Sequence, residues 1–259
     1  MNEMSVIDFS IHEANYTTVD KNWEKIVAVY PYNRIYYITD GLAEINLKGK
    51  RIVLEPGYLY FLPAFQVTSS VLIKPLTHYY LHFMLESGAA PYDFANLYSF
   101  RMKIKADETD DHMFRYAMTN RQTRNISEKL ALDASLRYFL SRLIDPEFFQ
   151  PVMQPWIEKI SVYINENIAG EITIDSLAKI AGYNRSYFSV VFKQHFKCSP
   201  KIFVLNQKLK KSMVMLMDTN LSITEISKKL NWSSNAYFSR IFKNKVGMSP
   251  SEYRSNFQR

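Results

Sequence analysis

The stretch Ile223-Thr-Glu-Ile-Ser-Lys-Lys-Leu-Asn-Trp-Ser-Ser-Asn-Ala-Tyr-Phe-Ser-Arg-Ile-Phe-Lys243 decides the fold of the C-terminal third of the chain. Ser222 and Glu225 have the spacing of a capping box, which starts a helix. Asn231 lies where that helix must stop, because asparagine tolerates the left-handed backbone that follows a helix end. Beyond it, aromatic and aliphatic side chains recur at the i, i+3, i+4 spacing of a buried helical stripe. The stretch therefore predicts two short helices joined by a tight turn.

An earlier copy of this pattern begins at Ile174, 49 residues upstream. Its first helix is expected to stop at Gly182, and its second helix has the same apolar spacing. The two buried stripes are Phe188, Val191 and Phe192 in the first copy and Phe238, Ile241 and Phe242 in the second. Each copy ends in Ser-Pro, an N-cap followed by a proline suited to the first helical position. The repeat predicts an all-α domain over residues 155–259 with two helix-turn-helix units.

The second helix of each copy also has an outward face of small, polar and basic side chains. Ser239 and Arg240 lie on this face in the second copy, and Val190 takes the position of Arg240 in the first. Small side chains let a helix enter the major groove of DNA, where an arginine can read guanine. Lys193 and Lys243 lie further along and suit contacts to phosphates. The alternative interpretation is that both faces are ordinary solvated surfaces.

The charge of the chain is concentrated in the same region. The formal net charge is +7, yet residues 155–259 have 16 Lys and Arg against 7 Asp and Glu, whereas residues 1–154 have 16 against 18. A basic region beside a nearly neutral one suggests a polyanion as the partner of the basic region.

Together these residues resemble the AraC/XylS family of bacterial transcription regulators. The stretch from Asn231-Trp232 through Ser249-Pro250 to Tyr253-Arg254 follows the family signature, and the resemblance covers about residues 155–259. It implies a sequence-specific regulator that binds double-stranded promoter DNA, with RNA polymerase as a further partner. It also implies one helix, about Pro200 to Met217, that joins the two units and spans roughly 25 Å at 1.5 Å per residue.

The resemblance assigns residues to DNA contacts. The implied base contacts are Arg185, Ser186, Ser189 and Val190 in the first unit and Asn235, Ala236, Ser239 and Arg240 in the second. The phosphate contacts are Lys193, Lys243 and Arg254. The sequence departs from the family pattern at Val190, Asn231 and Lys208, where a larger polar residue, Gly and Arg are usual. Because Val190 can contact little more than a thymine methyl group or a sugar, we expect the first unit to read little sequence.

The N-terminal region has a different pattern. Residues from about 25 to 105 are expected to form short strands, with turn signals at Asp40-Gly41, Lys48-Gly49 and Pro56-Gly57. Such a pattern predicts an antiparallel sandwich or barrel. The segment Leu54-Glu-Pro-Gly-Tyr58 resembles the cupin-type sensor barrel of many AraC/XylS members, although Tyr58 stands where Asp is usual.

Residues from about 106 to 150 have apolar residues at near-helical spacing and end in the proline-broken stretch from Pro146 to Pro155. The expected fold is therefore α+β. Residues 1–105 form a cupin-like antiparallel β-barrel that senses a ligand, residues 106–150 a helical linker and dimerisation region, and residues 155–259 the DNA-binding domain. The apolar stripe of the helical linker has two interpretations. It forms the interface of a homodimer, or it is part of the core within the domain.

The resemblance to the sensor barrel implies a small-molecule effector, with a sugar as one class. The candidate ligand-binding residues are Arg34, Tyr36, His78, Tyr80 and His82. Alternation places His78, Tyr80 and His82 on one side of a strand. We expect no metal, because His12, His112 and His195 are expected outside the sheet and could not complete a ligand set. Ordinary barrel-wall side chains are the alternative interpretation.

The cysteine content and the segments that the sequence lacks reduce the number of possible function classes. The single Cys198 excludes an internal disulfide and fits a reducing cytoplasm. We expect no signal peptide, membrane partner, cofactor or enzymatic activity. The leading hypothesis is a ligand-responsive regulator. The alternatives are a regulator that acts without a ligand and uses its barrel for dimerisation or protein contact, a metal-dependent cupin enzyme with a DNA-binding appendage, and a protein that coats DNA without sequence preference.

Overall fold

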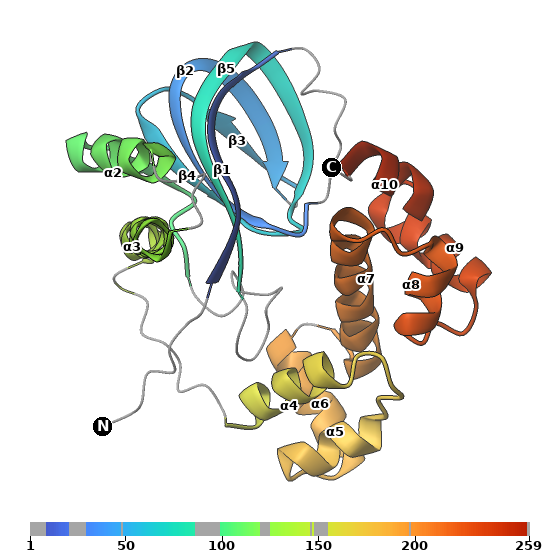
Figure 1. Ribbon diagram of the computed structural model, residues 1–259. Helices are drawn as coiled ribbons and strands as arrows, with labels where there is room; N and C mark the ends of the chain where they lie inside the picture. The colour runs from blue at the N-terminus through green and yellow to red at the C-terminus, as the bar shows by residue number, and fades with distance from the viewer. Residues whose placement is uncertain are drawn as a thin grey trace. The chain divides into compact units, whose positions relative to one another are not determined.

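The computed structural model describes residues 9–20, 30–47, 49–85, 99–119, 125–145, 147, 155–196 and 198–257. These residues form two compact units (Figure 1). The first contains an antiparallel sheet and helices α2 and α3, and the second contains helices α4 to α10. The chain is therefore a mixed α+β protein with its sheet in the N-terminal region, as the sequence predicts.

The first unit has six strands and two helices among the described residues. Its strands are β1 (Phe9–Val19), β2 (Asn33–Leu47), β3 (Lys50–Leu54), β4 (Tyr58–Leu62), β5 (Val67–Leu85) and β6 (Lys103–Lys105), and its helices are α2 (Glu108–Thr119) and α3 (Ile126–Leu143). The strands pair in the order β1-β5-β2-β4-β6, and β3 pairs with β2. Strand β2 thus pairs with three strands and is the centre of the sheet.

Strand β2 runs without a break through Asp40-Gly41, so the turn predicted at this dipeptide is wrong. The register with β5 shifts on both sides of Asp40, which marks an irregularity within one long strand. Gly41 has φ of 91°, and a Cβ atom there would lie 1.9 Å from the carbonyl oxygen of Pro75. Glycine is required here to bend the strand rather than to end it.

Strand β1 lies before the region in which strands were expected to begin. It pairs with β5 from Phe9↔Leu85 to Val19↔Leu76, with an irregularity between Ile11 and Glu13. His12 therefore lies within the sheet, and the expectation that it lies outside is wrong. The ring of His12 stacks on Tyr32, with the two centroids 4.0 Å apart.

The two faces of the sheet have different partners. On one face Ile35, Phe61 and Leu81 form a core with Phe114 of α2 and Phe139 of α3. The two helices cover this face in Figure 1. The opposite face has an apolar cluster of its own, which includes Ile38, Ile45, Leu54 and Leu76. Helix α3 buries Leu136, Phe139, Leu140 and Leu143, whereas Ile126 and Leu130 near its start are exposed.

The second unit is all helical over the described residues. Its helices are α4 (Pro155–Glu166), α5 (Ile174–Ala181), α6 (Arg185–Phe196), α7 (Pro200–Asp218), α8 (Ile223–Lys229), α9 (Asn235–Val246) and α10 (Pro250–Phe257). The predicted capping box at Ser222 and Glu225 is present. Ser199 caps α7, with Pro200 in its first turn. Local capping chemistry therefore fixes where these helices start.

Two helix pairs, α5 with α6 and α8 with α9, have corresponding cores. Phe188 and Phe192 of α6 and Phe238 and Phe242 of α9 are fully buried, as the repeat predicts. Val191 and Ile241, the third member of each stripe, are half-buried. Helix α7 joins the pairs and covers Pro200–Asp218, one residue longer than the helix that the family resemblance implies.

Candidate functional sites

The turns that orient α6 and α9 have left-handed residues at the positions that the sequence indicates. Gly182 ends α5 with φ of 73° and ψ of 24°. Asn231 follows α8 with φ of 48°, a conformation that asparagine tolerates better than most residues. Asn184 and Ser234 then accept hydrogen bonds from the backbone amides of Tyr187 and Tyr237 and start the next helices. Both second helices thus begin from a defined turn.

The outward faces of α6 and α9 carry the residues implied as base contacts. Arg185, Ser186 and Val190 are exposed on α6, and Ser189 is half-buried. On α9 the exposed residues are Asn235, Ala236 and Arg240, and Ser239 is half-buried. Lys193 and Lys243 are exposed further along the same faces. The structure therefore brings each group of four together on one accessible side of a short helix.

Neighbouring side chains hold some of these groups in place. The guanidinium of Arg240 lies 5.5 Å from the centre of the Tyr237 ring. In the first pair Arg185 forms an ion pair with Asp175 of α5, with 3.0 Å between Nη1 and Oδ2. Both partners are largely exposed, so this ion pair contributes little to stability and does not prevent Arg185 from reaching another anion.

Arg254 does not lie with the other predicted phosphate contacts. It belongs to α10, and its guanidinium donates hydrogen bonds to the backbone oxygens of Leu216 and Leu221. These oxygens lie at the end of α7 and in the segment before α8. Arg254 therefore satisfies carbonyl groups within the protein, and Lys193 and Lys243 are the two predicted phosphate contacts that lie on the outward faces.

The five candidate ligand-binding residues share the face of the sheet opposite α2 and α3. Pairing of β2 with β5 sets Arg34 beside His82, Tyr36 beside Tyr80 and Ile38 beside His78. The Tyr36 ring lies 4.7 Å from His78 and 6.4 Å from Tyr80, measured between centroids. Arg34, Tyr36, His78 and His82 are buried. The structure thus brings all five together.

Burial changes the titration of His78. It lowers the pKa of the imidazole from 6.5 to about 4, because the charged form loses its hydration on this face. His78 is therefore neutral at pH 7. The neutral imidazole and the rings of Tyr36 and Tyr80 form an aromatic, weakly polar part of this face.

Glu13 on β1 belongs to the same group, although the sequence did not indicate it. Its carboxylate accepts a hydrogen bond of 2.8 Å from the Tyr80 hydroxyl, and its other oxygen lies 3.6 Å from Nδ1 of His82. The signal that could have found it is the pairing of β1 with β5, which sets Glu13 opposite His82.

Three comparisons with known proteins bear on this geometry. A family profile described as "Helix-turn-helix domain" matches residues 177–256. The Msm operon regulatory protein of Streptococcus mutans is 24% identical over 237 residues, which cover 86% of this chain and 84% of that protein. The arabinose operon regulatory protein of Salmonella typhimurium is 28% identical over 131 residues, or 50% of this chain and 47% of that protein.

A solved structure resembles the whole chain. Unsaturated fatty acid bound ToxT from Vibrio cholerae has a TM-score of 0.61 at 15% identity, covering 95% of this chain and 94% of ToxT. The fold of both regions is therefore ToxT-like.

The chain resembles the AraC/XylS family of transcription regulators, through the helix-turn-helix match over residues 177–256 and the similarity to these operon regulators. It is a DNA-binding regulator, and the family profile covers α6, α7, α8 and α9 completely. The two relatives named above are operon regulatory proteins. Among the described helices, none combines the length and the apolar character that a membrane crossing requires.

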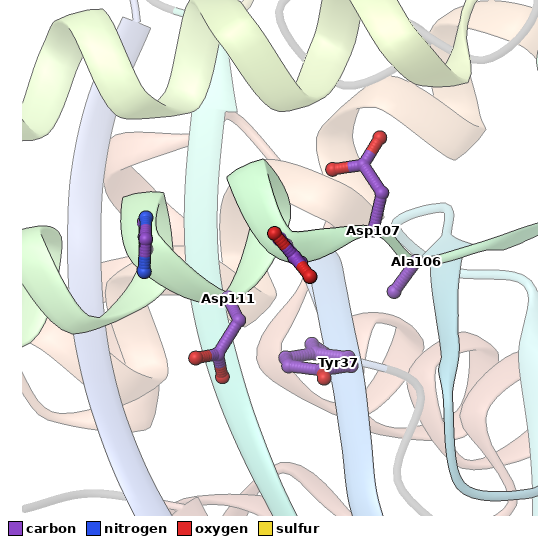
Figure 2. Close-up of a pocket in the computed structure, with 6 residues that line it drawn as sticks. Tyr37, Ala106, Asp107 and Asp111 are labelled. Atoms are coloured by element: carbon purple, nitrogen blue, oxygen red, sulfur yellow. The ribbon is translucent and has the colours of Figure 1, made fainter.

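The protein also has a surface pocket of about 440 Å³ where α2 meets the sheet (Figure 2). The pocket is lined by Tyr37, Ala106, Asp107, Glu108, Asp111 and His112. None of the five candidate ligand-binding residues is among them. Asp107 pairs with Arg142, and Asp111 pairs with Arg115. Because both aspartates are already paired, the acidic lining has less free charge than its composition suggests.

Lys208 of α7 links the linker helix to the second helix pair of the regulator. Its ammonium donates a hydrogen bond of 3.1 Å to the carbonyl oxygen of Asn231, in the turn before α9. Burial lowers the pKa of Lys208 from its usual value. Lys208 stands where the family usually has arginine, and it is still a cation that positions the turn.

Within the described ranges, no group of three or more His, Cys, Asp or Glu side chains is placed to hold a metal ion. His12 is in the sheet but stacks on Tyr32. His112 lies on α2 and His195 on α6.

Proposed function

We propose that α5–α6 and α8–α9 are two helix-turn-helix units that read a promoter operator. The observation that carries this proposal is the pair of accessible faces on α6 and α9, each oriented by a left-handed turn and anchored by two buried phenylalanines. The proposed base contacts are Arg185, Ser186, Ser189 and Val190 on α6 and Asn235, Ala236, Ser239 and Arg240 on α9. Arg240 is the strongest candidate for direct reading, since arginine can pair with guanine through two hydrogen bonds.

Lys193 and Lys243 are the proposed phosphate contacts. Both are exposed, and both lie about one turn beyond the base-contacting residues of their helices. Contacts of this kind fix a protein on DNA without reading sequence. The net positive charge of residues 155–259 supports the same function by attracting DNA before any base is read.

The N-terminal region is proposed as a sensor that controls DNA binding. In this proposal residues 1–105 form a cupin-like barrel, residues 106–150 link it to the DNA-binding domain of residues 155–259, and a small molecule binds at Arg34, Tyr36, His78, Tyr80 and His82. A ligand can act in this way if its affinity differs between two arrangements of the protein. The fatty acid bound to ToxT, which has the same fold, supports a small-molecule effector.

Several expectations of the sequence stay predictions. They are a sugar as the effector, a homodimer, contact with RNA polymerase and a cytoplasmic location. A regulator that acts without a ligand stays the alternative to ligand control, because its DNA-binding unit would be the same.

Selection of genomic DNA fragments by the full-length protein at physiological salt tests the proposed function. We expect a narrow set of fragments, which the Arg240→Ala variant loses or relaxes at one base position. Lys245→Ala is the matched control, since Lys245 is also exposed on α9 but lies on the opposite side of the helix from Arg240. Broad enrichment that is equal for all three proteins would instead indicate coating of DNA without sequence preference.

A further inference from the structure

Arg34 is a buried cation in the interior of the sheet unit. Its exposed fraction is 5%, and it lies on β2 between His82 of β5 and Leu62 of β4. A guanidinium keeps its proton at any ordinary pH. His78 on the same face escapes the cost of burial by losing its charge, with a pKa of about 4. Arg34 cannot do so, and its charge has to be compensated by contacts.

The contacts of Arg34 in the described part of the chain leave one edge of the guanidinium open. Nε and Nη2 are both buried and have no hydrogen-bond partner. These two nitrogens point their N–H groups in the same direction, along one side of the planar group. That side matches the two oxygens of a carboxylate, which accept a pair of parallel hydrogen bonds.

The neighbours of Arg34 stabilise a cation without supplying these hydrogen bonds. Its guanidinium carbon lies 4.8 Å from the centre of the Tyr30 ring and 6.0 Å from that of Tyr36. Aromatic faces attract the charge but offer no acceptor in the plane of the guanidinium. Glu13 is directed to the Tyr80 hydroxyl and to His82, one strand further away. Within the described ranges, no carboxylate forms an ion pair with Arg34.

We propose that the effector of this regulator is a small carboxylate whose two oxygens bind Nε and Nη2 of Arg34. This inference rests on the proposed sensor function and names a carboxylic acid, sugar acids included, as the class of effector. A bound carboxylate supplies both missing acceptors and compensates a charge that burial otherwise makes costly. The rings of Tyr36 and Tyr80 then contact the body of the ligand, and the hydroxyl of Tyr80, oriented by Glu13, sets one polar contact.

The test compares acids with neutral molecules of the same shape. The melting temperature of the full-length protein is measured with galacturonate against galactose, with benzoate against benzamide, and with inorganic phosphate. We expect at least one carboxylate to raise Tm by roughly 3–8 °C at saturation, and its neutral partner to have no effect. The Arg34→Gln variant should lose this shift, and Arg51→Gln should keep it, because Arg51 is exposed on β3.

A second variant tests the open edge without any ligand. Arg34→Met keeps a long side chain and removes the uncompensated charge, so we expect the ligand-free protein to melt at least about 2 °C higher than wild type. A lower Tm for Arg34→Met would show that the guanidinium holds the core together, and this result would overturn the proposal.

Three other results would also overturn it. They are no shift with any carboxylate, a shift with phosphate alone, and a carboxylate shift that Arg34→Gln retains. Binding to a genomic DNA fragment, measured separately, distinguishes the two proposals. If the wild type shows no sequence preference, the proposed DNA function is contradicted. The melting measurements use no DNA, so they would still show whether a carboxylate binds at Arg34.

Discussion

At the scale of single residues, Arg240 and Lys243 lie on one exposed face of α9 but have different expected roles. We expect Arg240→Ala to cost about 1–3 kcal/mol on the operator and almost nothing on random DNA, because it removes base reading. We expect Lys243→Ala to weaken both alike, because phosphates carry no sequence. Fluorescence anisotropy with both DNAs measures this difference. An equal loss on both DNAs for Arg240→Ala would contradict a base-reading role.

His78 gives the sheet unit a sensitivity to acid. Its pKa is about 4 when buried, below the ordinary value of 6.5, so the unfolded chain takes up the proton first as pH falls. The contribution of the neutral, buried His78 to the free energy of unfolding is fully present above pH 6.5 and is lost as the pH falls toward 4. At pH 5 we expect the wild type to have lost roughly 2 kcal/mol more than His78→Gln, relative to pH 7.5. Urea unfolding at both pH values measures the difference.

The matched control for His78 is His112→Gln, since His112 is exposed on α2. It should follow the wild type between pH 7.5 and pH 5. Equal acid sensitivity of the wild type and His78→Gln would show that burial of this imidazole does not govern the response.

At the scale of elements, β2 depends on Gly41 for its bend. A Cβ atom at this position would lie 1.9 Å from the Pro75 oxygen, and φ of 91° is strained for any other residue. We expect Gly41→Ala to destabilise the protein by about 3 kcal/mol or more, since a backbone contact and the left-handed conformation both oppose it. Thermal or urea unfolding measures the loss.

Gly57→Ala separates the two effects at Gly41. Gly57 has φ of 85°, but a Cβ atom there would have no atom within 4 Å apart from those of Gly57 and its two chain neighbours. Its expected cost is about 1–2 kcal/mol, from the backbone conformation alone. Equal losses for the two variants would mean that Pro75 moves aside and that the close approach at Gly41 is not needed.

The elements also differ in how far the sequence predicts them. The helices of the second unit follow local signals such as Gly182, Ser199 and Ser222, so their boundaries can be read from a few residues. Strand β1 has no such signal and forms by pairing with β5, far along the chain. The same reason hides Glu13, and it makes Asp40-Gly41 resemble a turn, since a bend and a turn both need glycine at positive φ.

At the scale of the whole molecule, the basic charge belongs to the DNA-binding region, so affinity for DNA should depend steeply on salt. We expect the logarithm of the binding constant to fall linearly with the logarithm of salt concentration. Lys193→Ala and Lys243→Ala should each reduce the slope by about 1, because each removes one phosphate contact. Titrations between about 50 and 200 mM salt measure the slope.

Arg254→Gln is the informative comparison for the salt dependence. Arg254 donates its hydrogen bonds to Leu216 and Leu221 and not to the surface that carries Lys193 and Lys243. Its replacement should lower the stability of the fold and leave the slope nearly unchanged. If Arg254→Gln reduces the slope by the same amount as the lysine variants, Arg254 contacts a phosphate as the sequence predicts.

Helix α7 limits how the two segments of an operator can be spaced. It joins the two helix pairs without a flexible segment between Pro200 and Asp218, and Lys208 ties it to the turn before α9. One inserted residue would rotate α8 and α9 by about 100° around the α7 axis and shift them by about 1.5 Å. The length of α7 therefore fixes the separation of the two helix pairs. We expect the distance between the two operator segments to be the same at every gene that the protein controls.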